Sequence, residues 1–158
     1  MAITMITVTA ARRDAGYELL RKTDDLGFDA VGAGWYQAEE EGRWRFFLVT
    51  SMIDSKGPRW VYDQLMAALR VIKIPDGIKP LEIHLVSPRE ERFYDLRKRL
   101  HVPTYPQDGK RDLFHAHGPD IEKLGIYAIV LYRMKDMDNR AGDIARQFAA
   151  KVRELEAA

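Results

Sequence analysis

The chain has 158 residues, of which 46% are hydrophobic and 31% charged, a composition that suits one globular domain (1–158) and excludes disorder throughout. Cysteine is absent, which excludes disulfides, thiolate metal sites and cysteine nucleophiles. The 25 lysines and arginines nearly balance the 24 acidic residues, so the chain has no polybasic character and we expect no nucleic-acid partner.

The start of the chain, residues 1–10, is apolar but short, and it lacks the basic leader of a signal peptide. We expect an edge strand or a loosely held arm there. No stretch approaches the roughly 18 apolar residues that a membrane span requires, so we expect no membrane association. Together with the absence of cysteine, this favours a cytoplasmic protein.

The first third of the chain predicts a helix followed by a β-hairpin. The helix covers residues 12–26 and ends at Gly27, which suits a left-handed cap. Two strands follow at 28–38 and 43–53, joined by a polar loop that contains glycine. Gly32-Ala33-Gly34 lies inside the first strand, where glycine indicates a bulge or a close backbone approach.

A second helix and a strand–helix pair come next. Pro58 suits the first position of a helix whose apolar residues recur at helical spacing. Residues 81–86 alternate in polarity and predict a strand. Ser87-Pro88-Arg89-Glu90 reads as a capping box, with Ser87 at the N-cap, so the following helix should begin at Pro88.

Residues 101–120 form a long irregular segment rich in proline and glycine, with a short strand expected near 113–117. A further strand at 124–134 and a helix from about residue 139 complete the chain. Hairpin and crossover connections are mixed. We therefore expect an α+β single domain, with a mixed or antiparallel sheet of four to five strands and helices mainly packed on one face.

Two strand-to-helix junctions offer a candidate site for a small anionic ligand. If the two preceding strands are parallel neighbours, both helix starts lie at one sheet edge, where free N–H groups favour a phosphate or carboxylate. The alternative is that the same residues only cap helices. The predicted ligand-binding residues are Ser55, Lys56, Gly57, Ser87 and Arg89.

His115 and His117 are the one cluster with metal-ligand chemistry. In an extended segment, residues i and i+2 project to the same face, so both imidazoles can reach one ion. A third ligand would have to come from Asp112, Asp120 or one of the distant histidines His84 and His101. The alternative is a solvated histidine pair in a polar loop.

Aromatic and basic residues alternate around the predicted hairpin, with Trp35-Tyr36 in one strand and Arg43-Trp44-Arg45 in the other. Such a surface can hold a partner or stack bases, but cross-strand packing also explains it. No Walker, GxGxxG or GxSxG motif is present, and no convergent catalytic set is visible.

The stretch from Gly27 to Tyr62 resembles a family of short uncharacterised bacterial proteins. The matching residues are Trp35, Tyr36, Trp44, Arg45, Asp54, Lys56, Gly57, Pro58 and Tyr62, with Tyr132 and Arg133 at a later strand end. The resemblance implies a bacterial, cytoplasmic protein and carries no activity, substrate or catalytic residue.

Three hypotheses follow for the function. We favour a non-catalytic binding or accessory protein, with a protein partner or a second copy of itself, because surfaces are present and a catalytic set is not. One alternative is the small-ligand module at the two helix starts. The other is a metal-dependent enzyme that uses His115 and His117. The favoured hypothesis predicts no cofactor and no enzymatic activity.

Overall fold

The computed structural model describes residues 8–105, 112–136 and 141–158 of the chain. The strands are β1 (Gly32–Gln37), β2 (Arg45–Val49), β3 (Ile83–Val86), β4 (Phe114–His117) and β5 (Ala128–Met134). The helices are α1 (Ala10–Asp25), α2 (Met52–Lys56), α3 (Pro58–Ile72), α4 (Glu91–Arg99), α5 (Pro119–Glu122) and α6 (Ala141–Ala157). A 3-10 turn, η1 (Pro80–Glu82), leads into β3.

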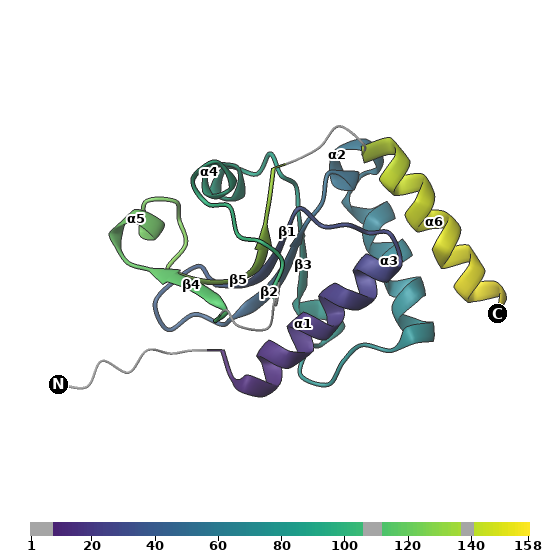
Figure 1. Cartoon of the computed structure of the whole chain (residues 1–158), viewed down its shortest axis with the longest axis horizontal. Coiled ribbons are helices and arrows are strands. Elements are labelled where there is room, and N and C mark those ends of the chain that lie inside the picture. Colours follow the sequence, from purple (N-terminus) through teal and green to yellow (C-terminus); the bar gives the residue numbers. More distant parts are fainter. Residues whose placement is uncertain (1–7, 106–111, 137–140) are drawn as a thin grey trace.

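The five described strands form one sheet in the order β3-β2-β1-β5-β4 (Figure 1). β3 runs parallel to β2, whereas the other neighbouring pairs are antiparallel. The sheet is therefore mixed. A hairpin joins the antiparallel strands β1 and β2, whereas the crossover through α3 joins the parallel strands β2 and β3. This confirms the predicted α+β fold with a mixed sheet of four to five strands.

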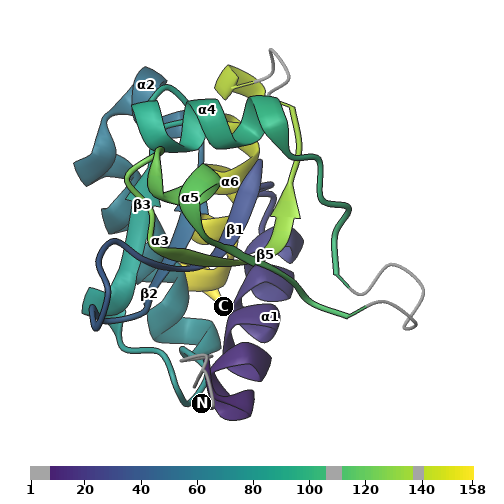
Figure 2. The same ribbon diagram turned by 90° about the vertical axis from the view of Figure 1, so that its left-hand side faces the viewer.

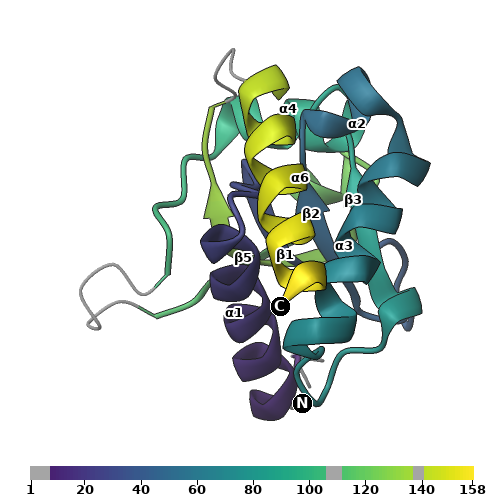
Figure 3. The same cartoon turned by 90° about the vertical axis from the view of Figure 1, so that its right-hand side faces the viewer.

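Helices cover the two faces of the sheet unequally. The three long helices α1, α3 and α6 lie on one face (Figure 3), and the shorter α4 and α5 lie on the other (Figure 2). Side chains alternate between the faces along each strand. Trp35 and Phe46 join the core beneath the long helices, while Tyr36 and Phe47 pack beneath α4.

The C-terminus of α1 follows the predicted pattern. Gly27 has φ +77°, and its amide donates to the Asp24 carbonyl at 2.9 Å. The Phe28 amide donates to the Thr23 carbonyl at 3.0 Å, and the Phe28 ring is buried. These two bonds form the Schellman arrangement, which confirms Gly27 as the cap.

The first hairpin is confirmed, but its strands are shorter than predicted. β2 ends at Val49 rather than near Ile53, because Thr50 turns the chain into α2. The Thr50 hydroxyl accepts a hydrogen bond from the Met52 amide at 3.1 Å, which satisfies a donor at the helix start. Ile53 therefore lies in a helix, where sequence periodicity alone had assigned it to the strand.

The predicted start of α4 is wrong by three residues. Ser87 begins a turn, in which its carbonyl accepts from the Glu90 amide at 3.0 Å. Glu90 is the N-cap, and its carboxylate accepts from the Phe93 amide at 3.3 Å. Both Ser87 and Glu90 have side chains that can cap a helix. The sequence pattern favours Ser87, but Glu90 is the N-cap of α4 in the structure.

Residues 101–120 contain more regular structure than predicted. β4 confirms the short strand expected near 113–117, and α5 follows it directly. Val102 forms an isolated bridge with Met134 of β5. Residues 106–111 lie outside the described part of the chain, as do residues 1–7 of the predicted N-terminal arm and residue 139, where the last helix was expected to begin.

Strand β3 is also shorter than predicted, because residues 80–82 form η1. Leu81 therefore leaves the alternating pattern and is 93% exposed.

Among the described helices, none combines the length and apolar character needed to cross a bilayer.

Candidate functional site

The two strand-to-helix junctions lie side by side. Val49 and Val86, the last residues of the parallel strands β2 and β3, are register partners. The Thr50 amide donates to the Val86 carbonyl at 2.9 Å, and the Ser87 hydroxyl donates to Asp54 Oδ1 at 2.7 Å. The expected meeting of the two junctions at one sheet edge is present in the fold.

The structure divides the predicted anion-binding residues between two places. Ser87 and Arg89 stay at the junction, where Ser87 Oγ accepts from the Arg89 amide at 3.1 Å. Lys56 instead places its Nζ 5.6 Å from the Trp60 ring centroid and lines a groove beside α6. Ser55 donates to the Met52 carbonyl at 3.3 Å within α2. Gly57, with φ +85°, links α2 to α3.

Carboxylates already occupy hydrogen-bond donors at this edge. The Asp54 carboxylate accepts a hydrogen bond from the Ser87 hydroxyl, and the Glu90 carboxylate accepts one from the Phe93 amide at the start of α4. An added anion would meet both negative charges, which offsets the attraction of the helix dipole. The junction is therefore less favourable to a phosphate or carboxylate than the sequence pattern indicated.

The two histidines of β4 share one face of an edge strand. Both are exposed, whereas Phe114 and Ala116, which alternate with them along the strand, pack toward the core. His84 lies on β3, at the opposite edge of the sheet. Within residues 8–105, 112–136 and 141–158, no three His, Cys, Asp or Glu side chains are grouped as a metal site requires.

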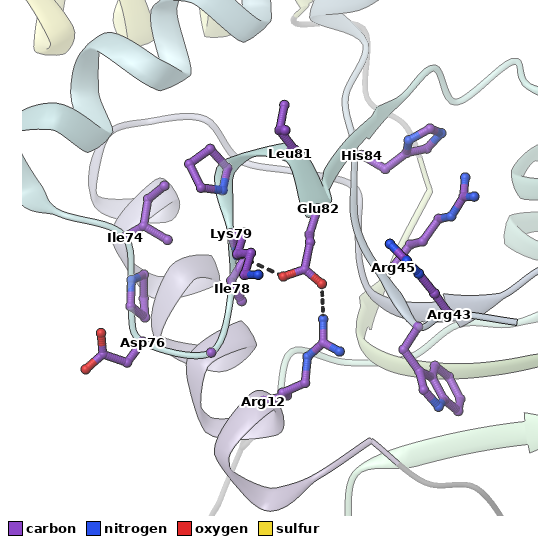
Figure 4. A pocket seen from close by; sticks show the side chains of 14 residues that line it. Arg12, Arg43, Arg45, Ile74, Asp76, Ile78, Lys79, Leu81, Glu82 and His84 are labelled. Carbon is purple, nitrogen blue, oxygen red and sulfur yellow. Dashed lines mark hydrogen bonds and ion pairs between the residues drawn. The ribbon is translucent and has the colours of Figure 1, made fainter.

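A larger concavity lies where α1, the start of β2 and the segment 74–84 meet (Figure 4). Its volume is about 1150 Å³, above the usual range of small-molecule pockets. We call it the basic cleft. It is lined by Arg12, Arg43, Trp44, Arg45, Ile74, Pro75, Asp76, Gly77, Ile78, Lys79, Pro80, Leu81, Glu82 and His84.

Arg12 forms one wall of the basic cleft and is held from two sides. Its guanidinium group lies 4.4 Å from the Trp35 ring centroid and forms an ion pair with Glu82. The second oxygen of Glu82 accepts from the Lys79 amide at 3.0 Å. Figure 4 shows this Arg12–Glu82 contact crossing between α1 and η1. The arrangement fixes the position of Arg12.

Two donors on residues of the basic cleft lack partners. Arg12 Nε and Trp44 Nε1 are both inaccessible to solvent, and neither makes a hydrogen bond within the described residues. A buried donor without an acceptor costs free energy, and an acceptor that reached either group would recover it.

Arg43 and Arg45 stand on the same side of the basic cleft (Figure 4). Both side chains are exposed, and neither forms an ion pair with a carboxylate in the described part of the chain. The cleft as a whole has four cationic side chains against two carboxylates, Asp76 and Glu82. Among the described residues, three of these cations form no ion pair, namely Arg43, Arg45 and the exposed Lys79.

His84 adds a titratable group beside Arg45. Partial burial lowers the pKa of His84 from its ordinary value of 6.5, and the charges of Arg45 and Arg92 lower it further. Glu90 acts in the opposite direction and raises it. The imidazole is therefore mainly neutral at pH 7 and adds a further positive charge to the cleft only in acid or beside a bound anion.

Part of the basic cleft is visible in the amino-acid sequence. The Arg43-Trp44-Arg45 segment was noted as an aromatic and basic stretch, although no ligand was assigned to it. Arg12 and Glu82 were not singled out, and they are separated by 70 positions. No short motif links such residues, so only the packing of α1 against η1 reveals that they share a site.

Comparisons with models of protein families, with curated proteins and with solved structures gave no match to this chain.

Proposed function

We propose that this protein is a non-catalytic binding protein whose basic cleft holds a ligand through a carboxylate or phosphate group. The observation that carries the proposal is the pair Arg43 and Arg45, two guanidinium groups on one side of a large concavity that have no carboxylate partner among the described residues. Guanidinium groups present donors in a fork that matches carboxylate and phosphate oxygens.

The other groups in the cleft suit the same role. Arg12 Nε and Trp44 Nε1 supply two further donors that lack acceptors. The lining also contains the apolar side chains of Trp44, Ile74 and Ile78, which could contact the uncharged part of a ligand. The proposed ligand therefore combines an anionic group with an apolar body.

The lining of the cleft favours binding over catalysis. It contains no serine, threonine or cysteine that could act as a nucleophile. His84 has no hydrogen-bonded nucleophile beside it, and Glu82 is engaged by Arg12 and the Lys79 amide. These residues orient an anion, but they offer no route for transferring a group from it.

A protein partner or self-association is the second candidate, and Leu81 favours it. This side chain is 93% exposed and lies at the rim of the cleft, next to the edge strand β3. Edge strands can pair with a strand of another chain. We propose a cytoplasmic location for either role, because a chain without cysteine needs no oxidising compartment.

Isothermal titration of the protein with sodium phosphate and with sodium citrate, at low ionic strength, tests the cleft. The variant Arg43→Ala/Arg45→Ala should weaken binding roughly 10-fold to 100-fold, as the loss of charged hydrogen bonds implies. Arg99→Ala is the matched control, since Arg99 is an exposed arginine in the last turn of α4, outside the cleft. Equal affinities for the wild type and the double variant would overturn the proposal.

A further inference from the structure

A second groove, separate from the basic cleft, lies between α3 and α6. Its volume is about 390 Å³, within the range of pockets that hold small molecules. The lining residues are Lys56, Trp60, Gln64, Ala145, Arg146, Ala149 and Arg153, none of which lines the basic cleft. We call this the helical groove.

Three cations surround the helical groove. Arg146 forms an ion pair with Asp143, one turn earlier on α6. Lys56 and Arg153 are exposed, and neither pairs with a carboxylate in the described part of the chain. No carboxylate is among the lining residues themselves. The local field of the groove therefore favours a negative group.

The floor of the groove is apolar. Trp60 is half-buried and packs against the core of the long helices. The Lys56 ammonium group lies 5.6 Å from its ring centroid, close enough to anchor an anion next to the indole. On α6, Ala145 and Ala149 carry only methyl groups, which leaves space that a longer side chain would fill.

We propose that the helical groove binds a small anion carried on a flat apolar ring, such as an aryl phosphate. The ring would lie against Trp60 and the two alanines, and the phosphate would contact Lys56 and Arg153. Ring and charge are both needed, because the lining provides an aromatic wall and unpaired cations together. The proposal is independent of the function proposed for the basic cleft, since the two share no residue.

The probe is 1-naphthyl phosphate, with inorganic phosphate and 1-naphthol as its two halves, each measured by isothermal titration of the Arg43→Ala/Arg45→Ala variant, so that the basic cleft does not contribute to the signal. We expect 1-naphthyl phosphate to bind at least tenfold more tightly than either half. Inorganic phosphate binding as tightly as 1-naphthyl phosphate would show that the ring contributes nothing, and would overturn the proposal. Tight binding of 1-naphthol alone would overturn the role of the charge.

Two variants locate the binding. Ala149→Leu fills the groove without changing charge or helix propensity, and it should reduce the affinity at least tenfold. Ala150→Leu makes the same change at the next position of α6, outside the lining, and should keep wild-type affinity. Equal affinities for the two variants would place the ligand elsewhere.

Lys56→Ala/Arg153→Ala provides a test that does not depend on core packing, since both side chains are exposed. Added to Arg43→Ala/Arg45→Ala, it should reduce the affinity for 1-naphthyl phosphate at least tenfold. Unchanged affinity would overturn the helical groove, and loss of 1-naphthyl phosphate binding in Arg43→Ala/Arg45→Ala itself would assign the probe to the basic cleft. Failure of the cleft experiments alone leaves this proposal intact.

Discussion

Arg133 and Asp24 form a two-point ion pair that joins β5 to the last turn of α1. Arg133 Nη1 lies 3.0 Å from Asp24 Oδ1, and Nη2 lies 2.6 Å from Oδ2. Arg133 is only 7% exposed and also donates to the Ala30 carbonyl at 3.0 Å and to Thr104 Oγ1 at 2.8 Å. One buried side chain thus connects four segments of the chain.

Asp24→Asn should therefore lower the free energy of unfolding, because it leaves the Arg133 charge buried without its counter-ion. Breaking a fully buried pair costs about 3–5 kcal/mol. Asp24 is 31% exposed, so water screens part of the interaction and we expect about 2 kcal/mol. Urea unfolding followed by circular dichroism measures the change.

The control for this pair is Asp25→Asn, which removes the same charge from the neighbouring exposed position. It should leave the unfolding midpoint close to that of the wild type. Equal midpoints for the two variants would mean that the Arg133–Asp24 pair contributes no net stability.

Gly34 lies in β1 with its Cα directly against the backbone of β5, and we predict that it tolerates no side chain. The register of the two strands shifts between Ala33 and Gly34. A Cβ atom at Gly34 would lie 3.0 Å from the Val130 carbonyl carbon and closer still to its oxygen. Gly34→Ala should cost more than about 3 kcal/mol, since the clash is with backbone that cannot move aside cheaply.

At Gly142, the same substitution to alanine is expected to increase the stability of the protein. It is an exposed position in α6, and a Cβ there meets no atom within 4 Å. Gly142→Ala should stabilise the protein by about 0.5–1 kcal/mol, because glycine loses more backbone entropy in a helix than alanine does. Urea unfolding of both variants compares them. Near-wild-type stability of Gly34→Ala would show that the strands do not approach as closely as described.

These positions also show which parts of the fold the sequence could predict. The cap at Gly27 and the irregularity at Gly34 were predicted because glycine reports a local backbone requirement. The start of α4 was misplaced because Ser87 and Glu90 both have capping side chains, and the choice depends on tertiary contacts. The Ser87 hydroxyl donates a hydrogen bond to Asp54, 33 positions away in the sequence.

The basic cleft could be predicted only in part, for the same reason. Arg43 and Arg45 belong to one short stretch, and their alternation with Trp44 was visible in the sequence. Their relation to Arg12 depends on how α1 crosses the sheet, and the Arg12–Glu82 pair spans 70 positions. The helical groove likewise is lined by residues far apart in the sequence, such as Lys56 and Arg153. Neither the basic cleft nor the helical groove therefore has a sequence motif of its own.

His115 and His117 should not form a strong zinc site. Two imidazoles on one strand face provide two ligands, and no third ligand is grouped with them in the described residues. We expect Zn²⁺ to shift the melting temperature of the wild type and of His115→Ala/His117→Ala by the same small amount. Zinc that copurifies with the wild type and is lost from the double variant would contradict this expectation and favour the metal-dependent enzyme.

His84 should report anion binding in the basic cleft through its pKa. The pKa of free His84 should lie below 6.5, since partial burial, Arg45 and Arg92 all disfavour the imidazolium ion. A phosphate bound beside Arg45 would stabilise that ion and raise the pKa. By linkage, the affinity for an anion that does not itself titrate in this range, such as sulfate, should increase as the pH falls through the window between the free and bound pKa values.

An NMR titration of the His84 imidazole, with and without phosphate, measures both values. Arg45→Ala should raise the pKa of free His84 by removing one cation, and it should reduce the shift that phosphate causes. Lys98→Ala, on the exposed side of α4, removes a cation outside the cleft and should change neither value. A His84 pKa that is the same with and without saturating phosphate would mean that the anion binds away from Arg45, because a charge next to the imidazole cannot leave its protonation unaffected.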